Sequence, residues 1–176
     1  NRWREASLGI VLETPLARNR EGLESPLGNL FADALLAAVP DADVAIGMGA
    51  RRGGLRADLP AGALTRGSLY DVFPFDNRVV RLVLTGVQLQ QVLAGEVARR
   101  RRGIPSVSGV RVRVTCEADR PELEIVRSSG ARIDAAETLI VATTDFFATR
   151  ARFGSRATPM ETTLASAPLV RDAAAG

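Results

Sequence analysis

Short apolar runs and helical stripes alternate along the first part of the chain. Leu8 to Leu12 is an apolar run that predicts a strand, and the polar residues 14–24 predict a loop. Ser25 and Pro26 then predict a helix start, because a serine side chain caps free backbone N–H groups and proline fits the first helical position. Pro40 marks the end of this helix. Its core-facing stripe comprises Leu27, Leu30, Phe31, Ala34, Leu35 and Ala38.

The middle of the chain predicts two strands and two further helices. Residues 44–46 are all apolar and predict a buried strand, and the Val- and Leu-rich residues 78–84 predict another. A threonine cap predicts a short helix over residues 65–73. Thr85 and Gln88 form a capping-box pattern at the start of the next helix. The buried stripe of that helix comprises Leu89, Val92, Leu93 and Val97.

Four arginines at positions 99–102 follow this stripe and allow two interpretations. Positive charge is favourable at a helix C-terminus, where the backbone carbonyls carry partial negative charge. A run of basic residues can also bind nucleic acid. The helix-end interpretation is the simpler one, and the net charge of +3 is too small to argue for a nucleic-acid partner. We therefore expect no nucleic acid to bind.

The last third of the chain predicts a hairpin, a further strand and an irregular tail. Valines alternate with arginines over residues 110–114, which is the period of a half-exposed strand. Residues 117–121 are turn-like, and residues 123–126 predict the second strand of the hairpin. Residues 139–143 predict another strand, whereas the tail after residue 153 has no strong periodicity.

The composition agrees with a globular fold. Of 176 residues, 46% are apolar and 24% are charged, which is typical of a soluble domain. We therefore expect a single α+β domain over residues 1–176, with a mixed sheet and packed helices. No apolar run approaches the about 18 residues of a membrane-spanning helix, so we expect no membrane partner. The chain starts at Asn1, without methionine or a visible signal peptide, and we expect a fragment or a processed product.

The absence of histidine limits the chemistry of the chain. Zinc and two-metal hydrolytic sites normally use imidazole or thiolate ligands, and the Ser-His-Asp arrangement requires a histidine. Cys116 is the one cysteine, so no internal disulfide can form. Its place in an alternating strand predicts a small core residue. We therefore expect no catalytic residue, no metal site and no cofactor within this chain.

Several motifs occur in the order found in one known family. Gly53 and Gly54 allow a close backbone approach to a ligand, and Arg56 follows them. The further motifs are Phe73-Pro74-Phe75-Asp76-Asn77, Ser25-Pro26-Leu27-Gly28-Asn29-Leu30, Leu84-Thr85-Gly86-Val87-Gln88-Leu89, Ser106-Val107-Ser108-Gly109-Val110 and Val141-Ala142-Thr143-Thr144-Asp145-Phe146. With these motifs, the chain resembles the C-terminal domain of the 5'-nucleotidase family, which includes bacterial UDP-sugar hydrolases and animal ecto-5'-nucleotidases.

The resemblance implies that one domain carries out catalysis and the other binds the substrate. In this family, two divalent metal ions and a catalytic His-Asp pair belong to a separate N-terminal metallophosphoesterase domain. We expect that domain upstream in the same polypeptide, as the partner of this chain. The ligand of this chain would be a nucleotide or a related phosphate ester. Family resemblance also places the parent protein in the periplasm or outside the cell.

The resemblance also implies roles for three side chains. Phe75 and Phe146 correspond to the aromatic residues that stack on the two faces of the nucleobase, and Arg56 corresponds to an arginine directed toward the ribose. Stacking would contribute about 1–3 kcal/mol for each ring. The residues taken alone leave another interpretation open, because both phenylalanines fit a hydrophobic core and Arg56 fits a solvated loop.

The chain departs from the family pattern at two polar positions. Arg51 stands where the family has an asparagine that recognises the edge of the base. Arg152 stands where the family has an aspartate that binds the ribose hydroxyls, so a hydrogen-bond donor replaces an acceptor. A further family arginine corresponds to Arg18 or Arg20. Either the ligand is more anionic than usual, or the domain no longer binds nucleotides and is structural.

If the family placement holds, a group of arginines meets beside the two aromatic rings. This group comprises Arg51, Arg56, Arg150 and Arg152. Such a group repels itself unless negative charge balances it. The balance would come from an anionic ligand or from nearby carboxylates in the sequence, namely Asp58, Asp76 and Asp145.

The sequence thus predicts the substrate-binding domain of a 5'-nucleotidase-like enzyme that hydrolyses nucleotide phosphate esters. This chain alone is expected to be inactive. The alternative is a non-catalytic binding or interaction domain that keeps the fold with a degenerate nucleotide site.

Overall fold

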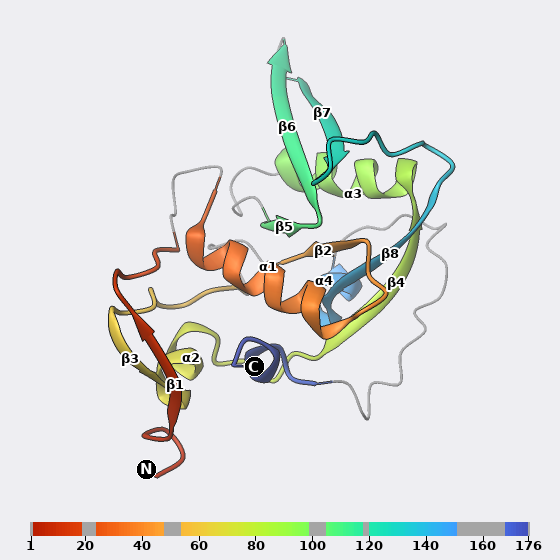
Figure 1. Ribbon diagram of the computed structural model, residues 1–176. Coiled ribbons are helices and arrows are strands. Elements are labelled where there is room, and N and C mark those ends of the chain that lie inside the picture. Colours follow the sequence, from red (N-terminus) through yellow and green to blue (C-terminus); the bar gives the residue numbers. More distant parts are fainter. Residues whose placement is uncertain are drawn as a thin grey trace.

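The computed structural model describes residues 2–18, 24–47, 54–98, 105–117, 120–150 and 168–175. The helices in these ranges are α1 (Pro26–Ala38), α2 (Arg66–Val72), α3 (Gly86–Ala98), α4 (Asp145–Arg150) and α5 (Val170–Ala173) (Figure 1). The strands are β1 (Ser7–Leu12), β2 (Val44–Ile46), β3 (Gly62–Thr65), β4 (Val79–Thr85), β5 (Val107–Ser108), β6 (Val110–Glu117), β7 (Arg120–Arg127) and β8 (Thr138–Thr144). The predicted α+β class is confirmed.

The central sheet has four strands in the order β4-β8-β2-β5. β8 runs parallel to β2, whereas β4–β8 and β2–β5 are antiparallel pairs, so the predicted mixed sheet is confirmed. Two further antiparallel ribbons, β1–β3 and β6–β7, form separate sheets. Figure 1 shows the β6–β7 ribbon extending away from the central sheet.

Each face of the central sheet packs against its own hydrophobic core. Ala45 of β2 and Ala142 of β8 are paired neighbours and belong to one cluster, while Val44 and Val141 are also paired and belong to the other. The first cluster includes Leu27, Phe31 and Leu35 of α1. The second includes Leu89, Val92 and Leu93 of α3. Because side chains alternate along a strand, α1 and α3 cover opposite faces of the sheet.

The capping residues that the sequence indicates do begin these helices. The Ser25 hydroxyl accepts a hydrogen bond of 3.0 Å from the backbone N–H of Gly28 at the start of α1. At the start of α3, the Thr85 N–H donates to the Gln88 side chain over 2.8 Å, and the Gln88 N–H donates to the Thr85 hydroxyl over 3.3 Å. Both patterns satisfy N–H groups that the first turn leaves free.

Local sequence patterns do not predict β3, α4 or α5. β3 forms because it pairs with β1, and α5 is fixed by Val170, which is only 2% exposed in the core. The predicted turn over residues 117–121 is too wide, since residue 116 pairs with residue 121 and residue 117 with residue 120. Arginines 99–102 lie outside the described residues, as does the side chain of Cys116.

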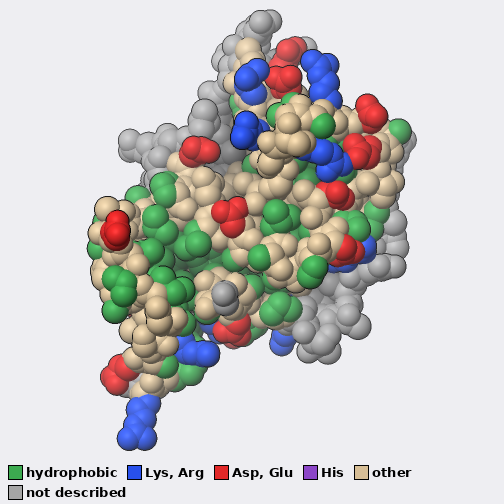
Figure 2. All heavy atoms as spheres, viewed as in Figure 1, with side chains coloured by type: hydrophobic (Ala, Val, Ile, Leu, Met, Phe, Trp, Pro, Cys, Tyr) green, Lys and Arg blue, Asp and Glu red, His purple; other side chains and the backbone are tan. Residues whose placement is uncertain are grey.

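Arg127 of β7 links the β6–β7 ribbon to the central sheet through hydrogen bonds. Its guanidinium donates hydrogen bonds to Glu137 and Asp43, which precede β8 and β2. The bond to Glu137 is the main reason that the pKa of Arg127 is raised, and Asp43 adds to it. Figure 2 shows acidic and basic side chains interspersed on the ribbon, where Arg113 pairs with Glu124 over 3.1 Å.

Among the described residues, no helix is long and apolar enough to cross a membrane.

Candidate functional site

The two segments that carry Phe75 and Phe146 lie next to each other. Phe75 precedes β4, and Phe146 follows β8, and these strands are antiparallel neighbours with Val79 opposite Thr144. The Asn77 side-chain amide donates a hydrogen bond of 2.9 Å to the Asp145 carboxylate. The backbone N–H of Asp145 also donates to the carbonyl oxygen of residue 78 over 3.0 Å. The sheet topology therefore joins residues that are about 70 positions apart.

Phe75 lies at the boundary between the core and the solvent. Its ring meets the ring of Phe73 edge to face, with centroids 5.3 Å apart and an angle of 78°. Phe73 is 1% exposed and packs in turn against Phe31 of α1, at 5.7 Å between centroids. Phe75 itself is half-buried. Phe73 is therefore the fully buried residue of the two, and Phe75 is a partly exposed residue that packs against the same core.

Arg56 contacts Phe75 directly. The central guanidinium carbon lies over the phenyl ring, 5.0 Å from its centroid, in a cation–π arrangement. The Arg56 side chain is exposed, and its backbone N–H donates to the carbonyl oxygen of Val72 over 2.7 Å, which fixes the loop to the end of α2. The sequence motifs place Arg56 near the site but give no sign of this contact.

Arg18 also binds the loop that carries Arg56. Its guanidinium donates to the carbonyl oxygen of Arg56. Its Nε and its backbone N–H both donate to the Asp58 carboxylate over 3.0 Å. The structure thus places Arg18 beside this loop, whereas Arg20 lies outside the described residues.

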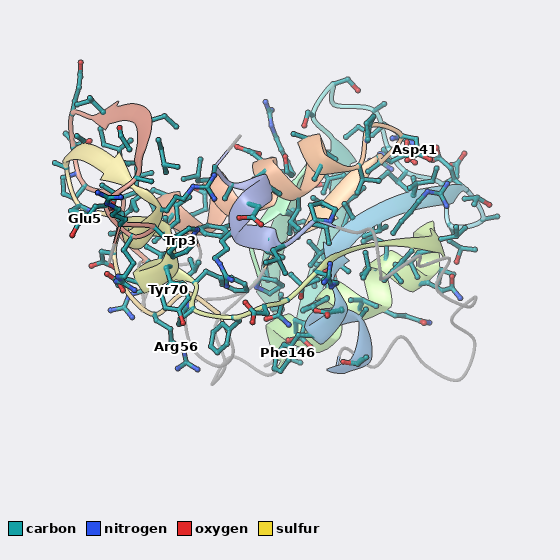
Figure 3. All side chains as sticks on the ribbon, turned by 90° about the horizontal axis from the view of Figure 1, so that it is seen from below. Trp3, Glu5, Asp41, Arg56, Tyr70 and Phe146 are labelled. Atoms are coloured by element: carbon teal, nitrogen blue, oxygen red, sulfur yellow. The ribbon has the colours of Figure 1, made fainter. Side chains whose placement is uncertain are left out.

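Phe146 lies in the first turn of α4. Its backbone N–H donates to the Asp145 carboxylate over 2.7 Å, and the N–H of Phe147 donates to the Thr144 hydroxyl over 3.0 Å. Phe146 is half-buried and packs against the same core cluster as Phe75, whereas Phe147 packs against the other cluster. In Figure 3, Phe146 and Arg56 both project at the same edge of the molecule.

The three carboxylates near the site already have polar partners. Asp58 pairs with Arg18, and Asp145 accepts from Asn77. Asp76 pairs with Arg171 of α5 at 2.5 Å. Two of the three carboxylates expected to balance the arginine group are therefore paired with Arg18 and Arg171. Asp76 is joined to a residue 95 positions away, a link that no local pattern indicates.

Arg51 and Arg152 lie outside the described residues. Arg150 has its backbone in α4, but its side chain is not described. Whether these arginines converge on Arg56 therefore remains a prediction. Among the described residues, no group of three or more Cys, Asp and Glu side chains is arranged to hold a metal ion.

A cavity of about 350 Å³ lies away from the two phenylalanines. It opens between α3 and the β5–β6 segment, and its apolar lining includes Leu93, Val97 and Val112. Asn29 and Arg111 supply polar groups at this cavity. None of the residues that the motifs assign to the site lines it within the described part of the chain.

Comparisons with known proteins agree with this architecture. The family model for the 5'-nucleotidase C-terminal domain matches residues 8–152. The trifunctional nucleotide phosphoesterase YfkN of Bacillus subtilis is 31% identical over 133 residues, which are 70% of this chain and 9% of that protein. Endonuclease YhcR of the same organism is 36% identical over 75 residues, or 43% of this chain and 6% of that protein.

Solved structures match over most of the chain. A 5'-nucleotidase precursor from Thermus thermophilus gives a TM-score of 0.81 at 23% identity, over 99% of this chain and 36% of that chain. The NAD nucleotidase of Haemophilus influenzae gives 0.68 at 20% identity, over 84% of this chain and 29% of that chain. At these identities the likeness establishes the fold. The chain spans less than a tenth of its curated relatives and about a third of these solved chains.

Proposed function

This chain belongs to the 5'-nucleotidase C-terminal domain family, and we propose that it is the substrate-binding domain of a larger enzyme that hydrolyses nucleotide phosphate esters. The domain extends over residues 1–176. An N-terminal metallophosphoesterase domain in the same polypeptide is its partner, and the parent protein acts in the periplasm or outside the cell.

The junction of the two aromatic segments is the observation that supports this proposal most. The Asn77–Asp145 hydrogen bond of 2.9 Å joins the segment of Phe75 to that of Phe146. Both residues are half-buried, so neither is fully enclosed in the core. Aromatic rings bind bases by stacking, which is tolerant of base identity. In our proposal, a nucleobase lies between Phe75 and Phe146.

In the proposed complex, Arg56 contacts the ligand as well as Phe75. Its guanidinium covers one face of Phe75 in the ligand-free chain. A base that stacks on Phe75 therefore either uses the opposite face or displaces the guanidinium. In both arrangements the N–H groups of Arg56 stay near the ligand, where they can donate to ribose hydroxyls or phosphate oxygens.

Hydrolysis belongs to the partner domain in this proposal. The chain has no histidine, and its described residues do not fit a metal ion. Two divalent metal ions in the partner domain would activate water and stabilise the charge on phosphate. The role of this chain is to bind and orient the nucleoside end of the substrate.

A second candidate function is favoured by the residues at positions 51 and 152. Arginines stand there in place of the asparagine and aspartate of the family pattern. A guanidinium cannot accept hydrogen bonds from ribose hydroxyls. The second candidate is therefore a domain that keeps the fold but serves as a non-catalytic binding or interaction module.

Calorimetric titration of the chain with adenosine 5'-monophosphate (AMP) distinguishes the two functions. We expect saturable binding by the wild type and its loss in the double variant Phe75→Ala/Phe146→Ala, with both proteins folded by circular dichroism. Equal binding by the two proteins would contradict the stacking site. No binding by the folded wild type at millimolar AMP would favour the non-catalytic module.

A further inference from the structure

We propose that Arg171 of α5 is a positioning residue that holds Phe75 in its binding orientation. The inference rests on the proposed function, because it assigns Phe75 a ligand. Arg171 lies 96 positions after Phe75 and outside the residues 8–152 that match the family model. It is therefore a feature of this chain that the family match does not cover.

Arg171 binds the backbone of Phe75 and the next side chain. One terminal nitrogen donates to the carbonyl oxygen of Phe75 over 2.6 Å, and the other donates to the Asp76 carboxylate over 2.5 Å. The Arg171 side chain is only 11% exposed, whereas that of Asp76 is 82% exposed. Charge-assisted hydrogen bonds are stronger than neutral ones. The burial of Arg171 limits competition from water for its bond to the Phe75 carbonyl, whereas the bond to the exposed Asp76 contributes less. Two bonds from one planar group fix both the position and the direction of the loop.

The backbone around Arg171 strengthens this attachment. Val170 donates from its N–H to the carbonyl oxygen of Asn77, and Val79 donates to the carbonyl oxygen of Pro168, each over 3.0 Å. A β-bridge also joins residues 78 and 169. Residues 168–171, which lead into α5, thus run beside residues 77–79; in Figure 1, α5 is the blue helix at the C-terminus. The side chain and the main chain of the C-terminal segment act on the same loop.

The loop that carries Phe75 has no regular secondary structure to fix it. Residues 73–77 form neither helix nor strand. Phe75 therefore depends on tertiary contacts for its orientation, and the bond from Arg171 holds its carbonyl group. A ring that is already in place binds a base without a further loss of loop entropy.

A buried nitrogen of Arg171 indicates that this arrangement is costly. The Nε atom is buried, and no hydrogen-bond partner for it exists among the described residues. A buried donor without a partner is unfavourable for folding. The guanidinium also lies over the Tyr70 ring, 5.2 Å from its centroid, which partly offsets this cost.

Arg4 provides a matched control for Arg171. Its guanidinium also lies over the Tyr70 ring, at 5.1 Å, and it also pairs with an aspartate, Asp71. Both of these contacts are with α2, whereas Arg171 reaches the Phe75 carbonyl. Arg4→Met therefore removes a stacked, ion-paired arginine on the same tyrosine without releasing the Phe75 loop.

The test compares Arg171→Met with Arg4→Met in calorimetric titrations with AMP. We expect Arg171→Met to bind AMP about tenfold more weakly, and Arg4→Met to bind as the wild type does. In a Phe75→Ala background, Arg171→Met should cause no further loss, because it acts through the ring that is already absent. Arg171→Lys keeps the charge but has one donor nitrogen in place of the two that Arg171 uses, and we expect an intermediate affinity.

A ligand-free measurement separates this inference from the proposed function. In protein labelled with fluorophenylalanine, we expect Arg171→Met to shift or broaden the fluorine signal of Phe75, while that of Phe31 and both signals in Arg4→Met stay unchanged. An unchanged Phe75 signal would overturn the inference. Unchanged AMP affinity in Arg171→Met, with affinity lost in Phe75→Ala, would also overturn it and leave the proposed function intact. If Arg171→Met does not fold, Arg171→Lys and Asp76→Asn are compared in the same way.

Discussion

At the scale of single residues, neighbouring phenylalanines differ in what their rings contact. Phe73 is 1% exposed and packs between Phe31 and Phe75. Phe75 has the Phe73 ring on one side and the Arg56 guanidinium over its face. Phe146 and Phe147 are both half-buried, but they pack against different cores. The two rings of each pair therefore have different surroundings.

Phe147 therefore serves as the control for Phe146. We expect Phe146→Ala to weaken the binding of AMP by about 1–3 kcal/mol, because the stacked face is lost. Phe147→Ala should lower the free energy of unfolding and leave AMP affinity unchanged. Calorimetric titration and denaturant unfolding of both variants check these expectations. Equal losses of affinity in the two variants would show that Phe146 acts through packing.

Arg51 and Arg152 carry a prediction about ligand charge. If they lie at the site, the wild type should prefer a nucleoside diphosphate to a nucleoside, and added salt should weaken that preference because it screens the charges. Arg51→Asn with Arg152→Asp should shift the preference toward adenosine. Titrations over a salt series measure both effects. Salt-independent affinities that are alike for charged and neutral ligands would contradict this prediction.

At the scale of secondary-structure elements, Gly109 lies between β5 and β6, where the chain passes close to the backbone of Asp43. Gly109 has a φ of +81°, and an added Cβ would lie 2.3 Å from the carbonyl oxygen of Asp43. Asp43 is itself held, since its N–H donates to the Ile140 carbonyl over 2.8 Å and its carboxylate accepts from Arg127. The backbone at Asp43 is therefore poorly placed to move aside.

Gly130 is the matched control for Gly109. It has a φ of +89°, but an added Cβ would meet no atom within 4 Å. We expect Gly130→Ala to cost about 1–2 kcal/mol of unfolding free energy, the penalty of the left-handed backbone alone. Gly109→Ala should lower the unfolding free energy clearly more. It carries the same backbone penalty, and its Cβ would also collide with the carbonyl oxygen of Asp43. Denaturant unfolding measures both, and similar losses would contradict the role of the Asp43 contact.

The elements that sequence patterns predict are those whose signals are local. Ser25, Thr85 and Gln88 mark helix starts through bonds to residues three positions away. β3 and α5 have no such signal, because each is fixed by contacts with distant segments. The same limit applies to the site. The motifs name Phe75, Arg56 and Phe146, but the link from Arg171 to the Phe75 carbonyl spans 96 positions and has no periodic pattern.

At the scale of the whole molecule, binding and cleavage belong to different domains in our proposal. The chain spans 36% of a solved 5'-nucleotidase precursor and 9% of a curated phosphoesterase. It contains 20 acidic residues but no histidine. Residues of the partner domain would then carry out hydrolysis, and this chain would bring the nucleoside to them.

The purified chain should therefore show no metal-dependent phosphatase activity. Metal-assisted hydrolysis needs a ligand set that binds the ion, and imidazole is normally part of it. Phosphate release from AMP, measured with added Mn²⁺ or Zn²⁺, should stay at the level of a buffer blank. A mock purification from cells without the gene controls for contaminating enzymes. Turnover that exceeds this control and follows the protein through chromatography would contradict the assignment of cleavage to another domain.

The central claim is that a base lies between Phe75 and Phe146, and nuclear Overhauser effects between AMP and the two rings test it most directly. With the chain saturated by AMP, we predict cross-peaks from the adenine H2 and H8 protons to the ring protons of both phenylalanines, and none to Phe147. Bound AMP that gives no cross-peak to either ring, or cross-peaks only to residues of the cavity between α3 and β6, would contradict the claim.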